Sequence, residues 1–486
     1  MPTFPQSIVP ELFREKAYRR YLATGLLLMT LQITLFKLLY PYADFFSDSY
    51  SYIYAAIAGL NVNLWPIGYT KFILLFHQIS HSDTALVVFQ YFCIQLSTLY
   101  LLLKIFYYYR PGKLVSNILF YVLMLNPVIP YLSNYISSDG LFLALSLCWA
   151  AQLITLLHRP TVLLLVVHSV LIAIAFTVRY NAIYYPIISA IAYLMSGRKV
   201  IYKTTGILLP VLLMGLFMNY TSNETKKYTG TKEFSVFGGW QLANNALYMF
   251  PHIEMKETPP AACAEFHQTV LRFFQKAGPQ MKDLRPSDGA FYLRDQNAPL
   301  KVYLAQKMSE KEDSSGGIQS WGSVSPIYAS YGKFLTKNYP VAFVRYFILP
   351  NTLNYWLPPI EKLNVYNLGS FRVYPIAQYW FDYPKDEVTA VSLNGQKAIL
   401  MFFPALFGAL NFIFLWAFFS LLRGGKFKSQ APKFKTVLLL FTCLLLVNAA
   451  FGILASPIVF RYLVFPMVLL IILSGVVIEK LDLSDK

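Results

Sequence analysis

Five charged side chains stand close to the ends of long apolar runs, where they could do chemistry at a membrane surface. They are Asp44, Asp48, Asp139, Arg179 and Arg461. A charged group beside a bilayer is costly, so each is a hypothesis for a functional site. A carboxylate can take a proton from a reacting hydroxyl group, and the planar guanidinium of an arginine can hold a phosphate. Together these residues suggest acid–base chemistry next to a phosphate group.

Each of these residues also has a purely structural interpretation. Asp48 and Asp139 both precede predicted helices, where an aspartate serves as an N-cap. Asp44 fits a loop or capping residue. Arg179 and Arg461 could extend to lipid headgroups, as long basic side chains do near helix ends. Arg461 is the hardest to explain in this way, because an arginine one turn inside an apolar helix normally faces an anionic partner or a wet cavity.

The elements that must position these residues are membrane helices. Of the 486 residues, 56% are hydrophobic and only 13% are charged, whereas soluble domains carry about 25% charged residues. Several apolar runs approach or exceed the roughly 18–20 residues that cross a bilayer. We therefore predict an all-α polytopic membrane protein. The net charge of +17 fits basic residues in short inside loops better than it fits a nucleic-acid partner.

We predict about ten membrane spans, with both ends of the chain in the cytoplasm. The predicted spans are Tyr21–Tyr40, Thr84–Phe106, Leu114–Leu132, Leu141–Leu157, Thr161–Val178, Ala182–Met195, Thr204–Asn219, Lys397–Leu422, Val437–Ala455 and Ile458–Ile478. The sixth is short for a span, so we expect it to be tilted, thin or broken. The first should be an uncleaved anchor behind the basic residues Arg14, Lys16, Arg19 and Arg20, because it lacks a small-residue cleavage site.

These spans divide the chain into three parts. Residues 1–219 form an N-terminal membrane module, and its first outer loop, 41–83, should hold two amphipathic helices at about Ser49–Gly59 and Ile67–Ile79. Residues 220–395 are polar and contain no full apolar span, so we predict a mixed extracytoplasmic domain there. Its apolar segment Tyr339–Pro359 should rest on the membrane or dip into it. Residues 396–486 form the C-terminal membrane helices.

Three histidines are weaker candidates for a functional site. His77 and His81 are four residues apart and Asp83 follows, so one helix face could bind zinc. The catalytic glutamate of the zincin motif is missing, which favours an ordinary solvated helix face. His168 lies in the middle of a predicted span and should form a hydrogen bond between helices.

The order of several short motifs resembles the GT-C glycosyltransferases, a superfamily that includes protein O-mannosyltransferases and the lipid A aminoarabinose transferase. These motifs are DSYSY at 48–52, WPIGY at 65–69, SSDGLF at 137–142, TVRYN at 177–181 and RYLVFP at 461–466. The resemblance covers the membrane half of the chain and hardly extends to 220–395. It implies a helix bundle with amphipathic helices in the first outer loop and a variable external domain.

The resemblance also implies a reaction. A sugar would move from a polyprenyl-phosphate donor to a hydroxyl group of a lipid, glycan or protein acceptor, with inversion, at the outer face of the membrane. Asp48 would act as the base, and the residues expected to bind substrate are Asp44, Tyr69, Lys71, Asp139, Arg179 and Arg461. No metal is required, although some family members use a divalent ion. The expected location is the bacterial inner membrane, with the site facing the periplasm.

The residue that would hold the donor phosphate stays open. Many relatives have a basic residue just before their ProPro motif, but Trp65 stands at that place here. The candidates are Lys71, Arg179 and Arg461.

Three other functions remain as alternatives. A polymerase or ligase acting on lipid-diphosphate glycans should carry more basic residues in the functional part of the large loop. A transporter of lipids or glycans should place charges near the bilayer midplane, but here they gather at one edge. A non-catalytic scaffold would be indifferent to the loss of Asp48.

Overall fold

The structure is a computed structural model that describes residues 15–310 and 317–482. Arg14, one of the basic residues expected before the first span, lies outside these residues. In the described part of the chain, eight helices are long and apolar enough to cross a membrane. They are α2 (Lys16–Leu39), α5 (Asp83–Tyr109), the pair α6 (Lys113–Met124) and α7 (Val128–Asn134), α8 (Ser138–His158), α11 (Val200–Thr229), the pair α20 (Gly395–Leu400) and α21 (Phe403–Arg423), α23 (Pro432–Ala455), and η9 (Phe460–Leu463) with α24 (Val464–Asp482).

Two shorter helices occupy the places of the fifth and sixth predicted spans. α9 (Val162–Val178) is apolar but has only 17 residues. The sixth segment, expected to be tilted, thin or broken, begins as the 3-10 helix η1 (Tyr180–Tyr184) and continues as α10 (Tyr185–Leu194). All these helices pack around one large apolar core. The chain is therefore an all-α, multi-pass membrane protein.

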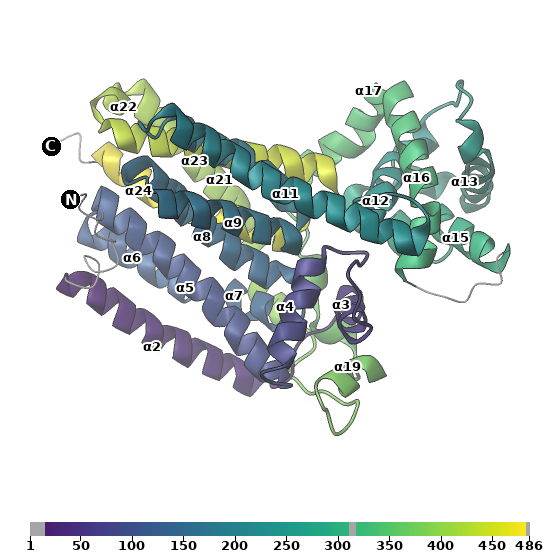
Figure 1. The fold of residues 1–486 in the computed structure, drawn as a ribbon, viewed down its shortest axis with the longest axis horizontal. Helices are drawn as coiled ribbons and strands as arrows, with labels where there is room; N and C mark the ends of the chain where they lie inside the picture. The colour runs from purple at the N-terminus through teal and green to yellow at the C-terminus, as the bar shows by residue number, and fades with distance from the viewer. Residues whose placement is uncertain (1–14, 311–316, 483–486) are drawn as a thin grey trace.

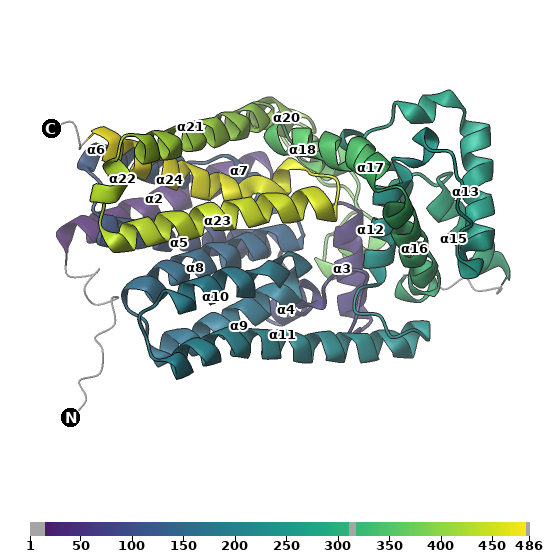
Figure 2. The ribbon, with the colours of Figure 1, turned by 90° about the horizontal axis from the view of Figure 1, so that it is seen from above.

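Different helices begin and end at the two ends of the bundle (Figures 1 and 2). At one, the basic end, α2 and α23 begin and α5 and α8 end. There Lys433 Nζ donates to the carbonyl of His158 over 3.4 Å, and Lys426 Nζ donates to the carbonyl of Leu481 over 3.0 Å. The short helix α22 (Lys426–Ser429) lies at this end. At the other, the site end, α2 ends and α8 begins.

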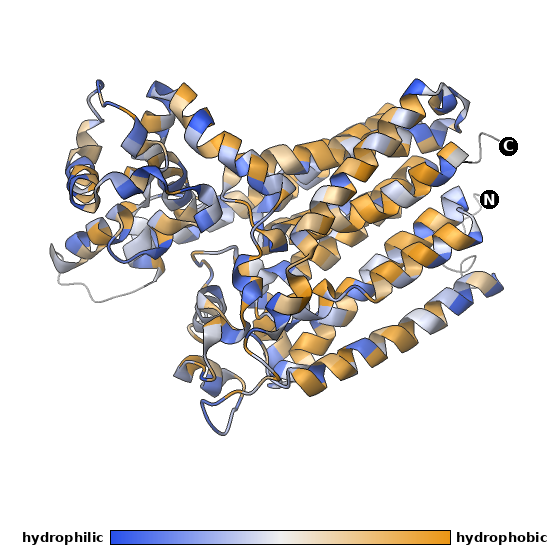
Figure 3. Cartoon of the chain, turned by 180° about the vertical axis from the view of Figure 1, so that it is seen from behind, coloured by the Kyte–Doolittle hydropathy of each residue, from blue (hydrophilic) through white to orange (hydrophobic). Residues whose placement is uncertain are grey.

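A domain formed by residues 236–310 and 317–348, the projecting domain, extends from the site end (Figures 1 and 2). Its hydropathy is mixed, whereas orange, hydrophobic residues run along the bundle helices (Figure 3). Its elements are α12 (Val236–Leu247), η2 (Phe250–His252), η3 (Ala261–Cys263), α13 (Ala264–Ala277), η4 (Pro279–Lys282), η5 (Pro286–Asp288), α14 (Phe291–Arg294), α15 (Pro299–Glu310), α16 (Ile318–Asn338), α17 (Pro340–Phe343) and the π-helical turn η6 (Val344–Ile348). It has a separate core built around buried aromatic residues such as Trp240, Phe266 and Tyr328.

The predicted unit 220–395 is divided differently in the structure. α11 continues to Thr229, and the segment after the projecting domain belongs to the bundle core. That segment contains α18 (Leu349–Trp356), η7 (Glu361–Asn364), η8 (Tyr366–Gly369) and α19 (Pro375–Trp380). It returns to the end of α2, where Val391 N donates to the Leu39 carbonyl over 2.8 Å. The described residues of 220–395 are mainly helical, with one isolated bridge, Arg372 with Glu387.

The first outer loop forms two helices close to those predicted, α3 (Ser47–Ile57) and α4 (Ile67–His77). α3 buries Tyr52, Ile53 and Ala56 against the bundle. In α4, an added Cβ on Gly68 would overlap the backbone of Thr177, so the absence of a side chain lets α4 approach the end of α9 closely. These contacts bring the first outer loop over the site end.

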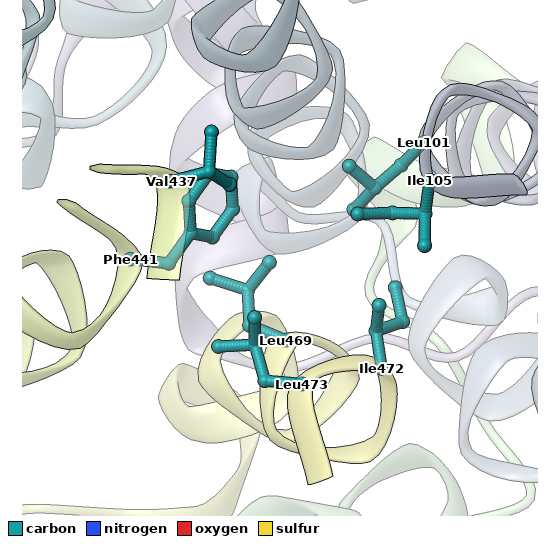
Figure 4. A pocket seen from close by; sticks show the side chains of 7 residues that line it. All are labelled: Leu101, Ile105, Val437, Phe441, Leu469, Ile472 and Leu473. Atoms are coloured by element: carbon teal, nitrogen blue, oxygen red, sulfur yellow. The ribbon is translucent and has the colours of Figure 1, made fainter. Parts of the chain in front are cut away.

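The bundle interior is tightly packed near the basic end. Seven apolar side chains of α5, α23 and α24 surround a void of about 10 Å³: Leu101, Ile105, Val437, Phe441, Leu469, Ile472 and Leu473 (Figure 4). This volume is at the lower limit for one water molecule, and its walls are apolar. The void is a packing defect and not a binding site.

Candidate active site

A cavity of about 700 Å³ lies between the site end of the bundle and the projecting domain. Eight charged side chains line it: Asp48, Asp139, Arg179, Arg294, Lys301, Glu361, Lys362 and Arg461. Five of these are basic and three are acidic. The cavity is large enough for a small-molecule ligand, and the excess of positive charge favours an anionic one.

Asp139 is held by two arginines from distant parts of the chain. Arg461 Nη1 donates to Asp139 Oδ2 over 2.8 Å, and Arg179 Nη1 donates to the other carboxylate oxygen. The Ser137 hydroxyl, which is the N-cap of α8, donates to Oδ2 over 2.9 Å and accepts from the Asp139 N–H. Asp139 is therefore not the N-cap itself. Its buried carboxylate is fully engaged, and neither arginine extends to the headgroups.

The two arginines share an aromatic neighbour. The ring centre of Tyr462 lies 4.7 Å from the guanidinium carbon of Arg179 and of Arg461, and its hydroxyl accepts from Arg461 Nη2 over 2.8 Å. Arg461 also lies over the ring of Phe46, at 5.2 Å. Arg461 Nε is buried and has no hydrogen-bond partner among the described residues. A buried guanidinium N–H without a partner is costly, so this donor is suited to an oxygen atom of a ligand.

Asp48 is in a different environment. The N-cap of α3 is Phe46, so the capping role expected for Asp48 is wrong; Asp48 lies in the first turn of α3. Its nearest cation is Lys362, with 3.7 Å between Nζ and Oδ2, and the Ser47 hydroxyl donates to it over 3.3 Å. Its side chain keeps 19% of its surface exposed, against 6% for Asp139. Asp48 is therefore the more exposed and the less tightly paired of the two carboxylates.

Lys362 comes from η7, in the segment that returns from the projecting domain. Burial lowers its pKa to about 8, although the nearby carboxylate of Asp48 opposes this shift. Its Nζ lies 4.1 Å from the ring centre of Phe46, on which Arg461 also lies. The Tyr135 hydroxyl donates to the Lys362 carbonyl and ties η7 to the bundle. Lys362 therefore adds a cation between Asp48 and the arginines.

The backbone of this returning segment is strained. Glu361, Asn367 and Leu368 have φ values of 55°, 46° and 54°, in the left-handed region that non-glycine residues rarely adopt. Strain of this kind persists only where the surroundings hold it, and it is common at ligand sites. Glu361 pairs with Arg294 at the edge of the cavity. The strained turn thus places the side chains of Glu361 and Lys362 on the cavity wall.

Three residues predicted to bind substrate do not line the cavity. Lys71 Nζ donates to the Leu60 carbonyl over 2.9 Å and closes the turn between α3 and α4. Tyr69 is buried and its hydroxyl donates to Gln90 Oε1 over 2.8 Å. Both have structural roles, and Lys71 is not among the cations that face the cavity.

Asp44 is the third of these residues, and it joins three segments. Its N–H donates to the Asn134 carbonyl over 2.9 Å, and its Oδ1 accepts from the Asn367 N–H over 2.8 Å. The side chain is buried, and this burial raises the pKa of Asp44 to about 8. Asp44 is a structural residue of the loop, as its alternative interpretation predicted.

The structure adds functional candidates that the sequence did not reveal. Arg294, Lys301, Glu361 and Lys362 all come from the region where no motif was recognised. Tyr462 is different, because it directly follows Arg461 in the RYLVFP motif. It could have been proposed from its position beside that arginine.

The histidines show no converging ligand set. The rings of His77 and His81 are stacked with 3.9 Å between their centres. The ring of Trp380 also stacks on His77, at 3.8 Å. His81 Nδ1 lies 2.6 Å from Asp382 Oδ2, while Asp83 accepts from the Ala43 N–H. Within residues 15–310 and 317–482, no three His, Cys, Asp or Glu side chains form a group that could hold a metal ion.

His168 takes the role expected from its position. Its Nδ1 lies 2.9 Å from Gln152 Oε1 on α8, and its Nε2 lies 2.9 Å from Ser189 Oγ on α10. The interhelical hydrogen bonding predicted for this residue is confirmed.

No protein-family model, no curated protein and no solved structure matches this chain. The fold and the cavity therefore define the class only as a multi-pass membrane protein with a charged cavity at one end.

Proposed function

We propose that this protein is a membrane glycosyltransferase of the GT-C type, which transfers a sugar from a polyprenyl-phosphate donor to an acceptor hydroxyl group. The observation that carries the proposal is that Asp48 and Arg461, from opposite ends of the chain, line one cavity together with further cations. A carboxylate able to take a proton beside a cluster that binds phosphate is what such a transfer needs.

The donor phosphate would lie against Arg461 and Lys362. Arg461 Nε offers an unused donor, and Lys362 adds an ammonium group close to Asp48. The end of α23 contributes Phe451, Gly452 and Ala455 to the same cavity. These apolar and small residues form an edge along which the prenyl chain can leave toward the membrane.

The chemical step is a single displacement at the anomeric carbon. Asp48 takes the proton from the acceptor hydroxyl as that oxygen forms its bond to the anomeric carbon. The bond from this carbon to the phosphate oxygen breaks, and polyprenyl phosphate leaves with the electron pair. Arg461, Arg179 and Lys362 stabilise the negative charge that remains on the phosphate. Attack from the opposite face inverts the anomeric configuration.

The two aspartates of the cavity would then have separate roles. Asp139 is neutralised by two guanidinium groups and holds the arginines in place, whereas Asp48 has one more distant cation. Two carboxylates whose surroundings differ in this way are typical of acid–base sites. No metal is needed, because the basic side chains already compensate the phosphate charge. If a divalent ion took part, Asp48 would be the carboxylate available to hold it, and the ion would add to the stabilisation of the leaving phosphate.

The proposed topology has ten spans, with α9 and α10 crossing a locally thinner region. The basic end then faces the cytoplasm, in agreement with the positive-inside rule, and the cavity faces the periplasm of a bacterial inner membrane. The charged cavity lies at one end of the bundle, whereas a transporter would favour charges near the midplane. The acceptor would be a lipid, glycan or protein on that side.

The test uses the purified full chain in lipid vesicles with labelled polyprenyl-phosphate hexoses and pentoses. Asp48→Asn should lower donor turnover by about 10²–10⁴-fold, the usual contribution of a general base, while the donor Kd stays unchanged. Asp382→Asn, an exposed carboxylate outside the cavity, is the matched control and should turn over normally. An Asp48→Asn protein as active as the wild type would refute the assignment and favour a scaffold.

A ligase or polymerase acting on lipid-diphosphate glycans is the second candidate. Arg294, Lys301 and Lys362, all from the segment 220–395, line the cavity, and this number of cations suits a diphosphate. Turnover of a polyprenyl-diphosphate oligosaccharide, with none of the monophosphate sugars, would favour this candidate.

A further inference from the structure

One wall of the cavity is aromatic and has no role in the phosphate chemistry. Trp65 precedes α4, Phe237 lies in the first turn of α12, and Trp321 lies in the first turn of α16. The rings of Trp65 and Phe237 are 4.5 Å apart, and those of Phe237 and Trp321 are 6.4 Å apart. These three residues, the aromatic wall, therefore form a continuous surface on the cavity.

The aromatic wall is held rigidly from behind. Trp240 is fully buried and stacks on Trp321 at 4.1 Å, and its Nε1 donates to the Trp321 carbonyl over 3.0 Å. Lys301 lies 3.9 Å from the ring centre of Trp321. A surface fixed in this way is preorganised, so a ligand loses little free energy in ordering it.

Polar groups stand beside these rings. Gln241, one helical turn after Phe237, and Ser235, the N-cap of α12, both line the cavity. A sugar ring has an apolar C–H face and a rim of hydroxyl groups. It can therefore cover an aromatic ring while its hydroxyl groups bind the amide and hydroxyl groups nearby. Ser235 Oγ already accepts from the Gly238 N–H, and Gln241 Nε2 donates to Asn245 Oδ1. A prenyl chain would offer no partner for the hydrogen bonds that these two side chains can still form, which disfavours it here.

We infer that the acceptor is a carbohydrate, and that the aromatic wall binds one of its sugar rings through Trp321. This inference rests on the proposed function for the acceptor role, because the wall and the base Asp48 share one cavity. The donor occupies the arginine cluster, and the acceptor glycan occupies the side formed by the projecting domain. Selection of the acceptor is thus a property of α12 and α16.

Binding can be measured without any transfer reaction. The probes are linear hexasaccharides of glucose, mannose, N-acetylglucosamine and galacturonic acid, titrated by calorimetry into the full chain in lipid nanodiscs. We expect one of them to bind. Trp321→Ala should raise its Kd about tenfold, which corresponds to about 1.4 kcal/mol. Trp65→Ala changes a loop outside the α12–α16 core and should also weaken binding. This second variant tests the inference if Trp321→Ala does not fold.

Trp356→Ala is the matched control. Trp356 packs on Phe412 at the end of α18 and does not line the cavity. Its replacement should leave the Kd unchanged. Failure of all four probes to bind would overturn the inference, as would equal binding by the wild-type protein and both cavity variants. Trp321-dependent binding of a Ser/Thr-rich peptide in place of any saccharide would overturn it too.

The outcomes separate this inference from the proposed function. Saccharide binding without turnover of any polyprenyl-linked donor would support the carbohydrate site and contradict the transferase activity. Donor turnover without saccharide binding would support the transferase activity and contradict the carbohydrate site.

Discussion

Arg461 Nη1 lies 2.8 Å from Oδ2 of Asp139, although the two residues are 322 positions apart in the chain. Arg179 binds the other carboxylate oxygen. The contact joins the beginning of α8 to η9 and the end of α9 in a nearly water-free place, with side chains exposed by 8% and 6%. Breaking a buried pair by removing one partner leaves an uncompensated charge.

Asp139→Asn should therefore destabilise the fold. Two buried guanidinium groups would lose their counterion, and we expect the free energy of unfolding to fall by about 3–5 kcal/mol. Denaturant unfolding in detergent micelles measures the change. Asp382→Asn removes a carboxylate that is 68% exposed and paired with His81, so it should change stability by less than about 1 kcal/mol. Equal effects of the two substitutions would contradict the role assigned to Asp139.

Donor binding should weaken as the pH rises through about 8. Lys362 has a pKa of about 8, so its ammonium is charged at pH 7 and largely neutral at pH 9. The charged groups that face it are Asp48 and Asp139, which raise the pKa, and Arg461 and Arg294, which lower it. Loss of the ammonium removes a phosphate partner. The measurement is the donor Kd from pH 6.5 to 9.5.

The matched variants for this pH profile are Lys362→Arg and Lys301→Arg. An arginine stays charged throughout the range, so Lys362→Arg should flatten the profile. Burial also lowers the pKa of Lys301 to about 8, but this residue lies on the aromatic wall. If only Lys301→Arg flattened the profile, the pH dependence would belong to Lys301, and the role predicted for Lys362 would be wrong.

Asp44 and Asp48 should respond oppositely to replacement by asparagine. The folded pKa of Asp44 is raised to about 8, so the folded protein holds a proton there that the unfolded chain releases above about pH 4. Between these values the unfolded state binds fewer protons, and stability falls as the pH rises. Asp44→Asn should remove this dependence and keep donor turnover at pH 7. Unfolding measured at pH 5 and pH 8, beside a turnover assay, tests this; turnover lost as in Asp48→Asn would contradict it.

Gly239→Ala should disrupt the packing of α12 on α16. An added Cβ at Gly239 would overlap the backbone carbonyl oxygen of Ser325, which a rotamer change cannot relieve. We expect a loss of stability of about 1–3 kcal/mol and weaker saccharide binding, because Phe237 and Trp321 lie on these helices. Gly215→Ala on α11, where nothing lies within 4 Å of the added atom, is the control and should be neutral or slightly stabilising. Thermal unfolding followed by tryptophan fluorescence compares them; an equal melting temperature would contradict the close packing.

Local sequence patterns predicted most of the helices correctly. Apolar runs of sufficient length located eight long helices. The short sixth segment, expected to be tilted, thin or broken, is irregular, because it changes from a 3-10 helix to an α-helix at Tyr185. Capping was less predictable, since Phe46 and Ser137 begin the helices that Asp48 and Asp139 were expected to cap. The structure divides residues 220–395 differently, because the returning segment packs on the loop that follows α2 through contacts between residues more than 300 positions apart in the chain.

By itself the sequence determined the class of the protein and four of the charged groups around its cavity. The length of an apolar segment decides whether it can cross a membrane, and a charged residue next to such a segment is costly, so its position alone suggests a function. Asp48, Asp139, Arg179 and Arg461 were found in this way. Only the tertiary structure decided that Asp139 is paired with two arginines while Asp48 has one more distant lysine, and that Lys362 and Trp321 belong to the same cavity. Those facts depend on side-chain distances between distant segments, and a polar loop carries no local signal of what it will contact.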